Sequence, residues 1–385
     1  MDDQSPRRTE LTGTILVTGA SGTVGHAVAE ALAAVGETVV AGMRDPRAWL
    51  AESARRASGT AAGQQPDRAG GRPDRAGSQP DRSGSGRAPG AGRTGAGPLG
   101  KPSRAPNQKP SRSPAHKPAG RPGGSTAAGA AQPGGAAVAT AADSSVTVRA
   151  FDFADRSTWA RALAGVDRVF LLVPPTISDV GRTLLPFIDQ AMEEADVEQI
   201  VFLSAPGVRF SHTSPHHAVE KYLKRTRAPH TVLRPTVLLQ TLSTLYRDDI
   251  RRRSEIVLPA AGAKVAFVDA DDVGRAAARV LTEPGHLGKA YSLAGEQALS
   301  YPQVAEILTA ELGRPIRYTP TSEADFTDLA VKQGASAADV AAQAGWYRAA
   351  RRRLVAVPNR SIRRLTGRPA TGLREFVEKN RHSWQ

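Results

Sequence analysis

One stretch of the chain joins glycines and small hydroxyl residues in a single turn, Thr18-Gly19-Ala20-Ser21-Gly22-Thr23-Val24-Gly25. It follows the apolar run 14–17, and apolar residues then recur at helical spacing up to Val35, which predicts a buried strand, the turn and a helix. Glycine lets the backbone approach a phosphate closely, and a helix N-terminus supplies free N–H groups and partial positive charge. This glycine turn, residues 18–25, therefore predicts a pyrophosphate site of the dinucleotide-binding kind.

The residue that follows the second predicted strand, 38–43, indicates which dinucleotide would bind. Arg44 stands at the place where an arginine accommodates a ribose 2′-phosphate and an acidic residue accepts the 2′-hydroxyl. Arg44 therefore favours NADP(H) over NAD(H). The next residue, Asp45, could still serve NAD, or it could cap a short helix that begins at Pro46.

Two residues after the third predicted strand, 146–150, are expected at the adenine. Asp152 could accept a hydrogen bond from the adenine amino group while Phe153 stacks near the ring. The alternative is a helix-capping region, because Asp155 also precedes a predicted helix at 155–164.

The ends of the fourth and fifth predicted strands are expected at the nicotinamide. Val173 and Pro174 close the strand 168–173 and would line the nicotinamide ribose. Ser204 closes the strand 199–204 and would lie beside them, since the carboxyl ends of parallel strands meet at one edge of a sheet.

The predicted helix 215–227 carries the titratable residues that are the candidates for catalysis. His216 and Glu220 are four positions apart, as are His217 and Lys221, so each pair can share one face of the helix. The positive end of the helix dipole disfavours protonation of a histidine in the first turn, which suits a neutral polarising donor. We take His216, Glu220 and Lys221 as the catalytic candidates, with substrate positioning or plain surface exposure as the alternatives.

Thiol and metal chemistry are not expected. The chain contains no cysteine, so it has no disulfide framework and no thiolate nucleophile or ligand. His212 lies close in sequence to His216 and His217, but Pro215 interrupts the spacing and no carboxylate completes a ligand set.

The formal net charge of +14 is distributed unevenly along the chain. Residues 55–145 carry 14 Lys and Arg against 4 Asp and Glu, residues 347–385 carry 11 against 2, and the remainder has a net charge of −5. The predicted nucleotide-binding body is thus slightly acidic. The basic runs 251–253 and 351–353 have no interleaved aromatic residues, so no specific nucleic-acid binding is expected.

Residues 55–145 form a low-complexity block in which 30 of 91 positions are Gly or Pro and none is aromatic. Such a segment cannot bury enough apolar surface to offset its conformational entropy, which predicts a disordered insert in a surface loop. The alternative is a basic arm at 55–145 that binds a protein partner or a polyanion.

The rest of the chain alternates predicted strands and helices, which indicates an α/β fold with a Rossmann-type, doubly wound parallel sheet. We expect a NAD(P)-binding domain at 11–235, interrupted by the insert 55–145, and a small, mostly helical substrate-binding or lid region at 236–385. Helices are expected at 179–194 and 238–252 within these two parts. A capping box is expected at Ser300–Gln303.

The sequence also bounds the location and the ligand. The N-terminus has no apolar signal-peptide core, and no apolar run approaches the roughly 18 residues of a membrane span. We therefore expect a cytoplasmic protein without a membrane partner that acts on a small-molecule substrate.

Taken together, these residues resemble the NmrA-like, atypical short-chain dehydrogenase/reductase family, over 13–54 and 146–385. The markers are the glycine turn, Met43-Arg44-Asp45-Pro46, the pair His216 and Glu220, and the run Phe267-Val268-Asp269-Ala270-Asp271-Asp272-Val273. The resemblance implies that the cofactor phosphates are held by Gly19, Ser21, Thr23, Val24 and Arg44. With these, the residues expected to bind the cofactor are Gly22, Gly25, Asp152, Phe153, Val173, Pro174 and Ser204.

The resemblance also implies what the protein does. Some members are NAD(P)H-dependent reductases of quinones, dyes or other small carbonyl compounds, and others are non-enzymatic redox sensors that regulate a protein partner. Mainstream short-chain dehydrogenases use a Tyr with Lys four positions on, and none of the six tyrosines here has one. That absence puts alcohol-dehydrogenase chemistry in doubt, while hydride transfer to a quinone can take its proton from water. Where many relatives have Asn near the nicotinamide, this chain has Pro235 and Gln240.

Overall fold

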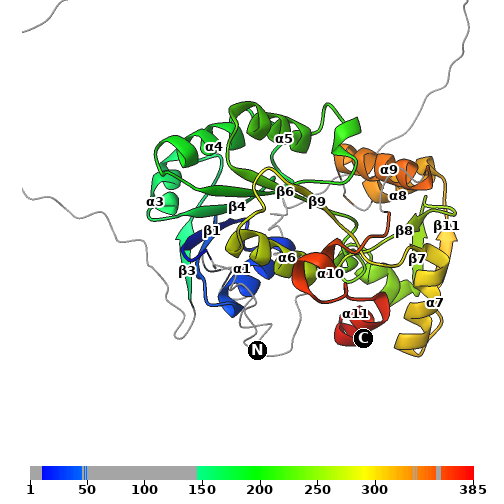
Figure 1. Ribbon diagram of the computed structural model, residues 1–385. Coiled ribbons are helices and arrows are strands. Elements are labelled where there is room, and N and C mark those ends of the chain that lie inside the picture. The colour runs from blue at the N-terminus through cyan, green and yellow to red at the C-terminus, as the bar shows by residue number, and fades with distance from the viewer. Residues whose placement is uncertain are drawn as a thin grey trace, which may run out of the picture. The chain divides into compact units, whose positions relative to one another are not determined.

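The structure, a computed structural model, describes residues 11–45, 47, 49, 145–332, 334, 336–352 and 357–385. These residues all lie in one compact unit of the chain (Figure 1). The expected insert 55–145 lies outside the described residues except for Ser145, and so does most of the short helix expected after Asp45.

Seven parallel strands form the central sheet, in the spatial order β3-β2-β1-β4-β5-β6-β9 (Figure 1). The order runs outward from β1 and β4 in both directions, so the sheet is doubly wound and the predicted α/β, Rossmann-type fold is confirmed. A crevice is expected at the carboxyl ends of β1 and β4, where the order reverses. The strands are β1 Thr14–Thr18, β2 Thr38–Met43, β3 Val146–Ala150, β4 Arg168–Leu172, β5 Gln199–Leu203, β6 His230–Pro235 and β9 Ala290–Leu293.

Helices cover both faces of this sheet because its strands are apolar on both sides. Along β1, Ile15 and Val17 pack into one core with α1 (Thr23–Ala34) and α6 (Ala270–Thr282), while Leu16 packs into a second core on the opposite face. That second face is covered by α3 Trp159–Leu163, α4 Leu184–Glu193 and α5 Pro215–Thr226 (Figure 1).

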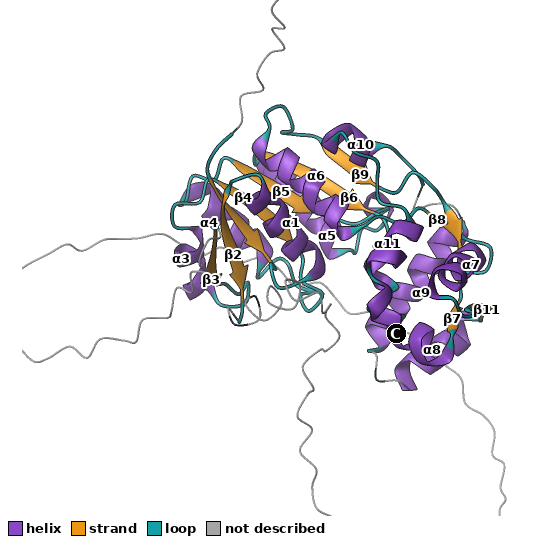
Figure 2. Cartoon of the chain, turned by 90° about the horizontal axis from the view of Figure 1, so that it is seen from below, coloured by secondary structure: helices purple, strands orange, loops and turns teal. Residues whose placement is uncertain are grey.

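The chain beyond β6 builds a third apolar core in a group of helices and short strands beside the sheet (Figure 2). Strands β7 (Glu255–Leu258) and β11 (Arg317–Pro320) pair in parallel, and β8 (Lys264–Val265) pairs antiparallel with β10 (Leu299–Ser300). The helices of this part are α7 Tyr301–Leu312, α8 Glu323–Lys332, α9 Ala337–Arg351 and α11 Leu373–Lys379. Helix α10, Ser361–Thr366, instead packs on α6 in the core that contains Ile15 and Val17. The boundary at 235 and 236 stays a prediction, and α6 and β9, which follow it, belong to the layers of the central sheet.

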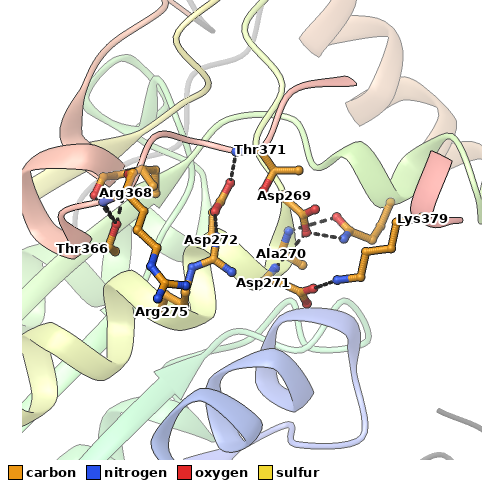
Figure 3. A network of polar contacts seen from close by, with 11 residues as sticks. Asp269, Ala270, Asp271, Asp272, Arg275, Thr366, Arg368, Thr371 and Lys379 are labelled. Carbon is orange, nitrogen blue, oxygen red and sulfur yellow. Dashed lines mark hydrogen bonds and ion pairs between the residues drawn. The ribbon is translucent and has the colours of Figure 1, made fainter. Parts of the chain in front are cut away.

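A polar network fastens the C-terminal helices to the start of α6 (Figure 3). Asp269 caps this helix by accepting a hydrogen bond from the backbone N–H of Asp271, at 2.9 Å. Lys379 in α11 donates to Asp271 at 2.8 Å, and the backbone N–H of Thr371 donates to the buried Asp272 at 2.7 Å. The last described residues are thereby fixed to the layer that carries the glycine turn.

Two expected helices are shorter in the structure than the sequence predicts. The helix expected at 179–194 is helical only over α4, because the Asp179 carboxylate and carbonyl accept hydrogen bonds from Arg182 and Thr183 in a separate turn. The helix expected at 238–252 is instead a 3-10 turn at Leu239–Thr241 and a single π-helical turn at Asp249–Arg253.

The physical reason for the second difference is local. Thr241, Ser243 and Thr244 each donate their hydroxyl to a nearby backbone carbonyl, which competes with regular helical hydrogen bonding. By contrast, the capping box at Ser300–Gln303 is confirmed, with both of its reciprocal hydrogen bonds formed. Among the helices described, none has the length and apolar character needed to cross a membrane.

Candidate functional site

A cavity of about 510 Å³ lies at the carboxyl ends of the central strands. Its wall is built by the glycine turn after β1 and by the segments that follow β2, β3, β4 and β5, with one contribution from α5. All twelve residues expected to bind the cofactor line it: Gly19, Ser21, Gly22, Thr23, Val24, Gly25, Arg44, Asp152, Phe153, Val173, Pro174 and Ser204. The structure brings these residues together, and their individual roles stay predictions.

The glycine turn has the backbone geometry that a phosphate cradle needs. Gly19 has a positive φ of 63°, and a Cβ atom added at Gly25 would lie far inside contact distance of the Gly19 carbonyl oxygen. Helix α1 begins directly after Gly22, where no side chain caps the free N–H groups and no acidic residue stands in the first turn. The turn therefore offers unoccupied donors and partial positive charge to an anion.

The part of the cavity after β2 contains Arg44, the exposed arginine that was expected at the adenosine ribose. Arg44 follows β2, and no ion pair ties it to another of the described side chains. Asp45 accepts a hydrogen bond from the backbone N–H of Arg47 at 3.0 Å, the contact of a helix-capping residue. Within the described part of the chain, Arg44 can therefore meet a ligand, whereas Asp45 already has a local partner.

Asp152 and Phe153 both belong to folded local structure. The Asp152 carboxylate accepts from the backbone N–H of Ala154 at 2.9 Å, and Asp155 caps the following turn by accepting from Ser157 N–H at 3.0 Å. The Asp155 capping role foreseen as the alternative is therefore present, while Asp152 still lines the cavity. The Phe153 ring meets Phe151 edge to face at 4.7 Å, so it forms a fixed apolar wall.

The far end of the cavity contains the segment after β4, Ser204 and His216. Burial lowers the pKa of His216 from its ordinary value, although the nearby carboxylate of Glu220 acts to raise it. Burial and the position in the first turn of α5 thus both favour the neutral form of His216. A neutral imidazole can donate one ring N–H to a ligand in the cavity.

Glu220 does not line the cavity but lies behind Ser204. Its carboxylate accepts a hydrogen bond from the Ser204 hydroxyl at 2.5 Å and two from Arg234, at 2.8 and 2.6 Å. Burial acts to raise the pKa of Glu220, yet the hydrogen bonds from Arg234 and Ser204 outweigh it and lower that pKa from its ordinary value. Glu220 is thus a charged, fully engaged group rather than a base that faces the cavity.

The third catalytic candidate lies elsewhere. Lys221 is exposed on α5 and is absent from the cavity wall. His217 lies on the same helix face as Lys221. Its Nδ1 is 3.2 Å from the Val208 carbonyl oxygen, which can only accept, so His217 is the donor in that contact. Its Nε2 is 3.4 Å from Nδ1 of His212. Among the described residues, no group of three or more His, Asp or Glu is arranged to hold a metal ion.

Arg234 is the functional residue that the sequence analysis missed. It stands at the end of β6, which is the neighbour of β5 in the sheet, and its guanidinium donates to Glu220, the carboxylate that also accepts from Ser204. The sequence contained a signal for this contact. An arginine in a strand of the central sheet needs an opposite charge nearby, and Glu220 lies on the helix that connects β5 to β6.

Gln240, which stands where relatives were expected to have Asn, is engaged within the protein. Its amide nitrogen donates to Asp269 at 2.8 Å, and its amide oxygen accepts from the Ala270 N–H at 3.0 Å. The side chain therefore supports the start of α6.

The doubly wound parallel sheet and the uncapped glycine turn at its crevice define a Rossmann-type dinucleotide-binding fold. A family model described as "NmrA-like family" matches residues 126–348, more than half of the chain. The chain belongs to the NmrA-like family.

Known proteins similar to this chain extend this picture. Festuclavine synthase I of Penicillium roqueforti is 30% identical over 61% of this chain and 84% of its own length. NAD(P)H azoreductase of Xenophilus azovorans is 29% identical over 60% of this chain and 82% of its own. The structure of the NADPH-dependent quinone oxidoreductase QOR2 of Escherichia coli, complexed with NADPH, is 21% identical, covers 94% of this chain and 98% of its own, and has a TM-score of 0.64.

Proposed function

We propose that this protein is an NAD(P)H-dependent oxidoreductase of the NmrA-like type that reduces a small-molecule acceptor. The observation that carries the proposal is the single cavity that joins the uncapped glycine turn, the exposed Arg44 and the end of β5. Its length along the strand ends suits a dinucleotide, with the adenosine towards β2 and β3 and the nicotinamide towards β4 and β5. The names of the similar proteins, a clavine synthase, an azoreductase and a quinone oxidoreductase, support the same class.

We further propose that the preferred cofactor is NADP(H). Arg44 is exposed at the cavity rim and has no ion-pair partner among the described residues, so it can meet a 2′-phosphate. Asp45, the residue that could favour NAD(H), is already engaged by the N–H of Arg47. A quinone or another small carbonyl compound is the proposed acceptor.

We propose separate roles for the residues that line the cavity and for the bound cofactor. The bound cofactor supplies two electrons and one hydrogen as hydride, and one further proton from water completes the two-electron reduction of the acceptor. Val173 and Pro174 provide apolar walls that exclude water from the reacting end and hold the two reactants together. The neutral His216 donates its ring N–H to the acceptor and polarises it.

A direct test follows NADPH oxidation at 340 nm with a panel of quinones, azo dyes and imines as acceptors. We expect turnover with at least one acceptor, and a His216→Gln variant with a lower kcat and an almost unchanged affinity for NADPH. Tight NADPH binding without turnover of any acceptor would instead favour the alternative of a redox sensor that acts through a protein partner.

The role of residues 55–145 stays a proposal of its own. We propose that this segment is a dispensable surface insert or a basic arm for a protein partner or polyanion, and that 236–385 closes over the bound substrate.

A further inference from the structure

Ser204 has a position in the cavity wall that the sheet fixes closely. It follows β5, only 4% of it is exposed, and its backbone N–H donates to the Leu233 carbonyl of β6 at 2.8 Å. Ser204 is therefore held by the hydrogen bonding of the sheet and is also part of the cavity wall.

The direction of the Ser204 hydroxyl is set by its contact behind the cavity. A carboxylate can only accept, so the 2.5 Å contact places the hydroxyl proton between Ser204 Oγ and Glu220 Oε1. A hydrogen bond from a hydroxyl to an ionised carboxylate is of the strong, charge-assisted kind at this distance. The proton is thus committed to Glu220 and is not available to a ligand.

Arg234 keeps Glu220 in this state. Its Nε and terminal nitrogen donate to the two carboxylate oxygens, and only 14% of the Arg234 side chain and 15% of the Glu220 side chain are exposed. A two-pronged contact of this kind fixes the orientation of the carboxylate as well as its charge. Because the Ser204 proton points to Glu220, a ligand in the cavity that reaches Ser204 Oγ would meet its lone pairs.

We propose that Ser204 accepts a hydrogen bond from the carboxamide amino group of the nicotinamide, and that Glu220 and Arg234 are positioning residues that hold Ser204 in this acceptor state. The inference rests on the proposed function, because it takes the cavity as the dinucleotide site.

The nicotinamide carboxamide has the hydrogen-bond donor that an accepting serine needs. A quinone, carbonyl or azo acceptor presents only lone pairs, so it has nothing to give to a serine that can only accept. The carboxamide amino group only donates, and the nicotinamide end of a dinucleotide is expected on the β4 and β5 side of the crevice. Ser204 would thereby select the orientation of the nicotinamide ring and the face that it shows to the substrate.

The test compares two ligands that differ in this one donor: NADP+ and its 3-acetylpyridine analogue, in which a methyl group replaces the amino group. Binding is measured by calorimetry, so the readout does not depend on turnover. For the wild-type protein we expect the analogue to bind about fivefold more weakly, as suits the loss of one neutral hydrogen bond. Ser204→Ala should bind both ligands equally, and Ser204→Thr, which keeps the hydroxyl, should restore the discrimination.

Two further variants separate positioning from a general loss of structure. Glu220→Ala frees the Ser204 proton, which can then bond to the carbonyl that both ligands share, so the discrimination should fall towards one. Ser211→Ala, which removes an exposed hydroxyl outside the cavity wall, should keep the wild-type ratio. If Glu220→Ala does not fold, as judged by its thermal transition, Glu220→Leu, which fills more of the space and cannot accept the Ser204 proton, takes its place with the same expected ratio.

The outcomes distinguish the two proposals. Equal binding of both ligands by the wild-type protein, or an unchanged ratio in Ser204→Ala, would overturn the inference and leave the proposed function standing. Failure of the wild-type protein to bind any of NADP+, NADPH or the analogue would overturn the proposed function and the inference with it.

Discussion

At the scale of single residues, the side chains around the cavity fall into those that meet the ligand and those that hold others in place. Arg44 and His216 face the cavity directly. Glu220 and Arg234 act only through Ser204, and their near-complete mutual hydrogen bonding explains why a carboxylate so close to the site does not enter it. The account therefore predicts distinct consequences for changes to each group.

Arg44→Gln should separate the two cofactors. The loss of a charged hydrogen bond to the 2′-phosphate should weaken NADPH binding roughly 10- to 100-fold and leave NADH binding within about twofold. Fluorescence titration with both nucleotides measures this, and Arg182→Gln, an exposed arginine after β4 that is absent from the cavity wall, is the matched control. An equal loss for both nucleotides would remove Arg44 from its proposed role.

Glu220 should shape the acid limb of the stability curve. Its pKa in the folded state lies below the unfolded value, so the stabilisation it provides is present above the unfolded pKa of about 4.3 and is lost as the pH falls through the folded value. Urea denaturation between pH 3 and 7 should therefore show a steeper loss of stability below about pH 4.3 for the wild-type protein than for Glu220→Gln. Parallel curves would show that Glu220 titrates alike in both states.

At the scale of elements, the turn between β1 and α1 connects the sequence pattern to the site. Two of its three glycines, Gly22 and Gly25, have different roles. A Cβ atom at Gly25 would collide with the Gly19 carbonyl, whereas one at Gly22 would lie 3.4 Å from that oxygen. Gly25 is required by the fold of the turn. Gly22 matters through the cavity that it lines.

Gly25→Ala and Gly22→Ala therefore form a matched pair. Gly25→Ala should destabilise the protein by about 1–3 kcal/mol through overpacking, and it should abolish dinucleotide binding because the turn must shift. Gly22→Ala should keep the wild-type thermal transition. A stable Gly25→Ala protein that binds NADPH normally would contradict this view of the turn.

The elements also show where sequence reasoning succeeds and where it ends. Residues 14–35 predict a strand, a turn and a helix, because periodicity and glycine spacing are local signals. The carboxyl ends of the strands can be predicted to lie at one edge of the sheet because the strands are parallel. The prediction of a helix at 238–252 is wrong because hydroxyl side chains in this segment donate to nearby backbone carbonyls. The spacing of apolar residues does not reveal this competition with helical hydrogen bonds. The link between Glu220 and Arg234 joins a helix and a strand, so it appears only once the neighbours in the sheet are known.

At the scale of the whole molecule, much of the C-terminal positive charge is compensated. Arg363 pairs with Glu296, Arg374 with Glu311 and Lys379 with Asp271. Basic residues near the C-terminal end of the chain are thus neutralised by acidic residues from earlier in the chain. The charge that is free to attract a polyanion is therefore expected in residues 55–145.

Replacing residues 55–145 by a short Gly/Ser linker should leave the thermal transition and the NADPH affinity unchanged. Loop length contributes to closure entropy only logarithmically, and β2 and β3, which flank the segment, are neighbours in the sheet. Retention on heparin should fall sharply and lose most of its salt dependence in the shortened protein. An unfolded product would show that the segment is part of the fold.

The central claim is that the cavity along the strand ends binds NADP(H), and calorimetric titration of the full chain with NADPH, NADP+, NADH and NAD+ tests it most directly. We expect one site per chain, with NADPH bound at least tenfold more tightly than NADH. Absence of binding by all four nucleotides would contradict it, and tighter binding of NADH than of NADPH would contradict the role of Arg44.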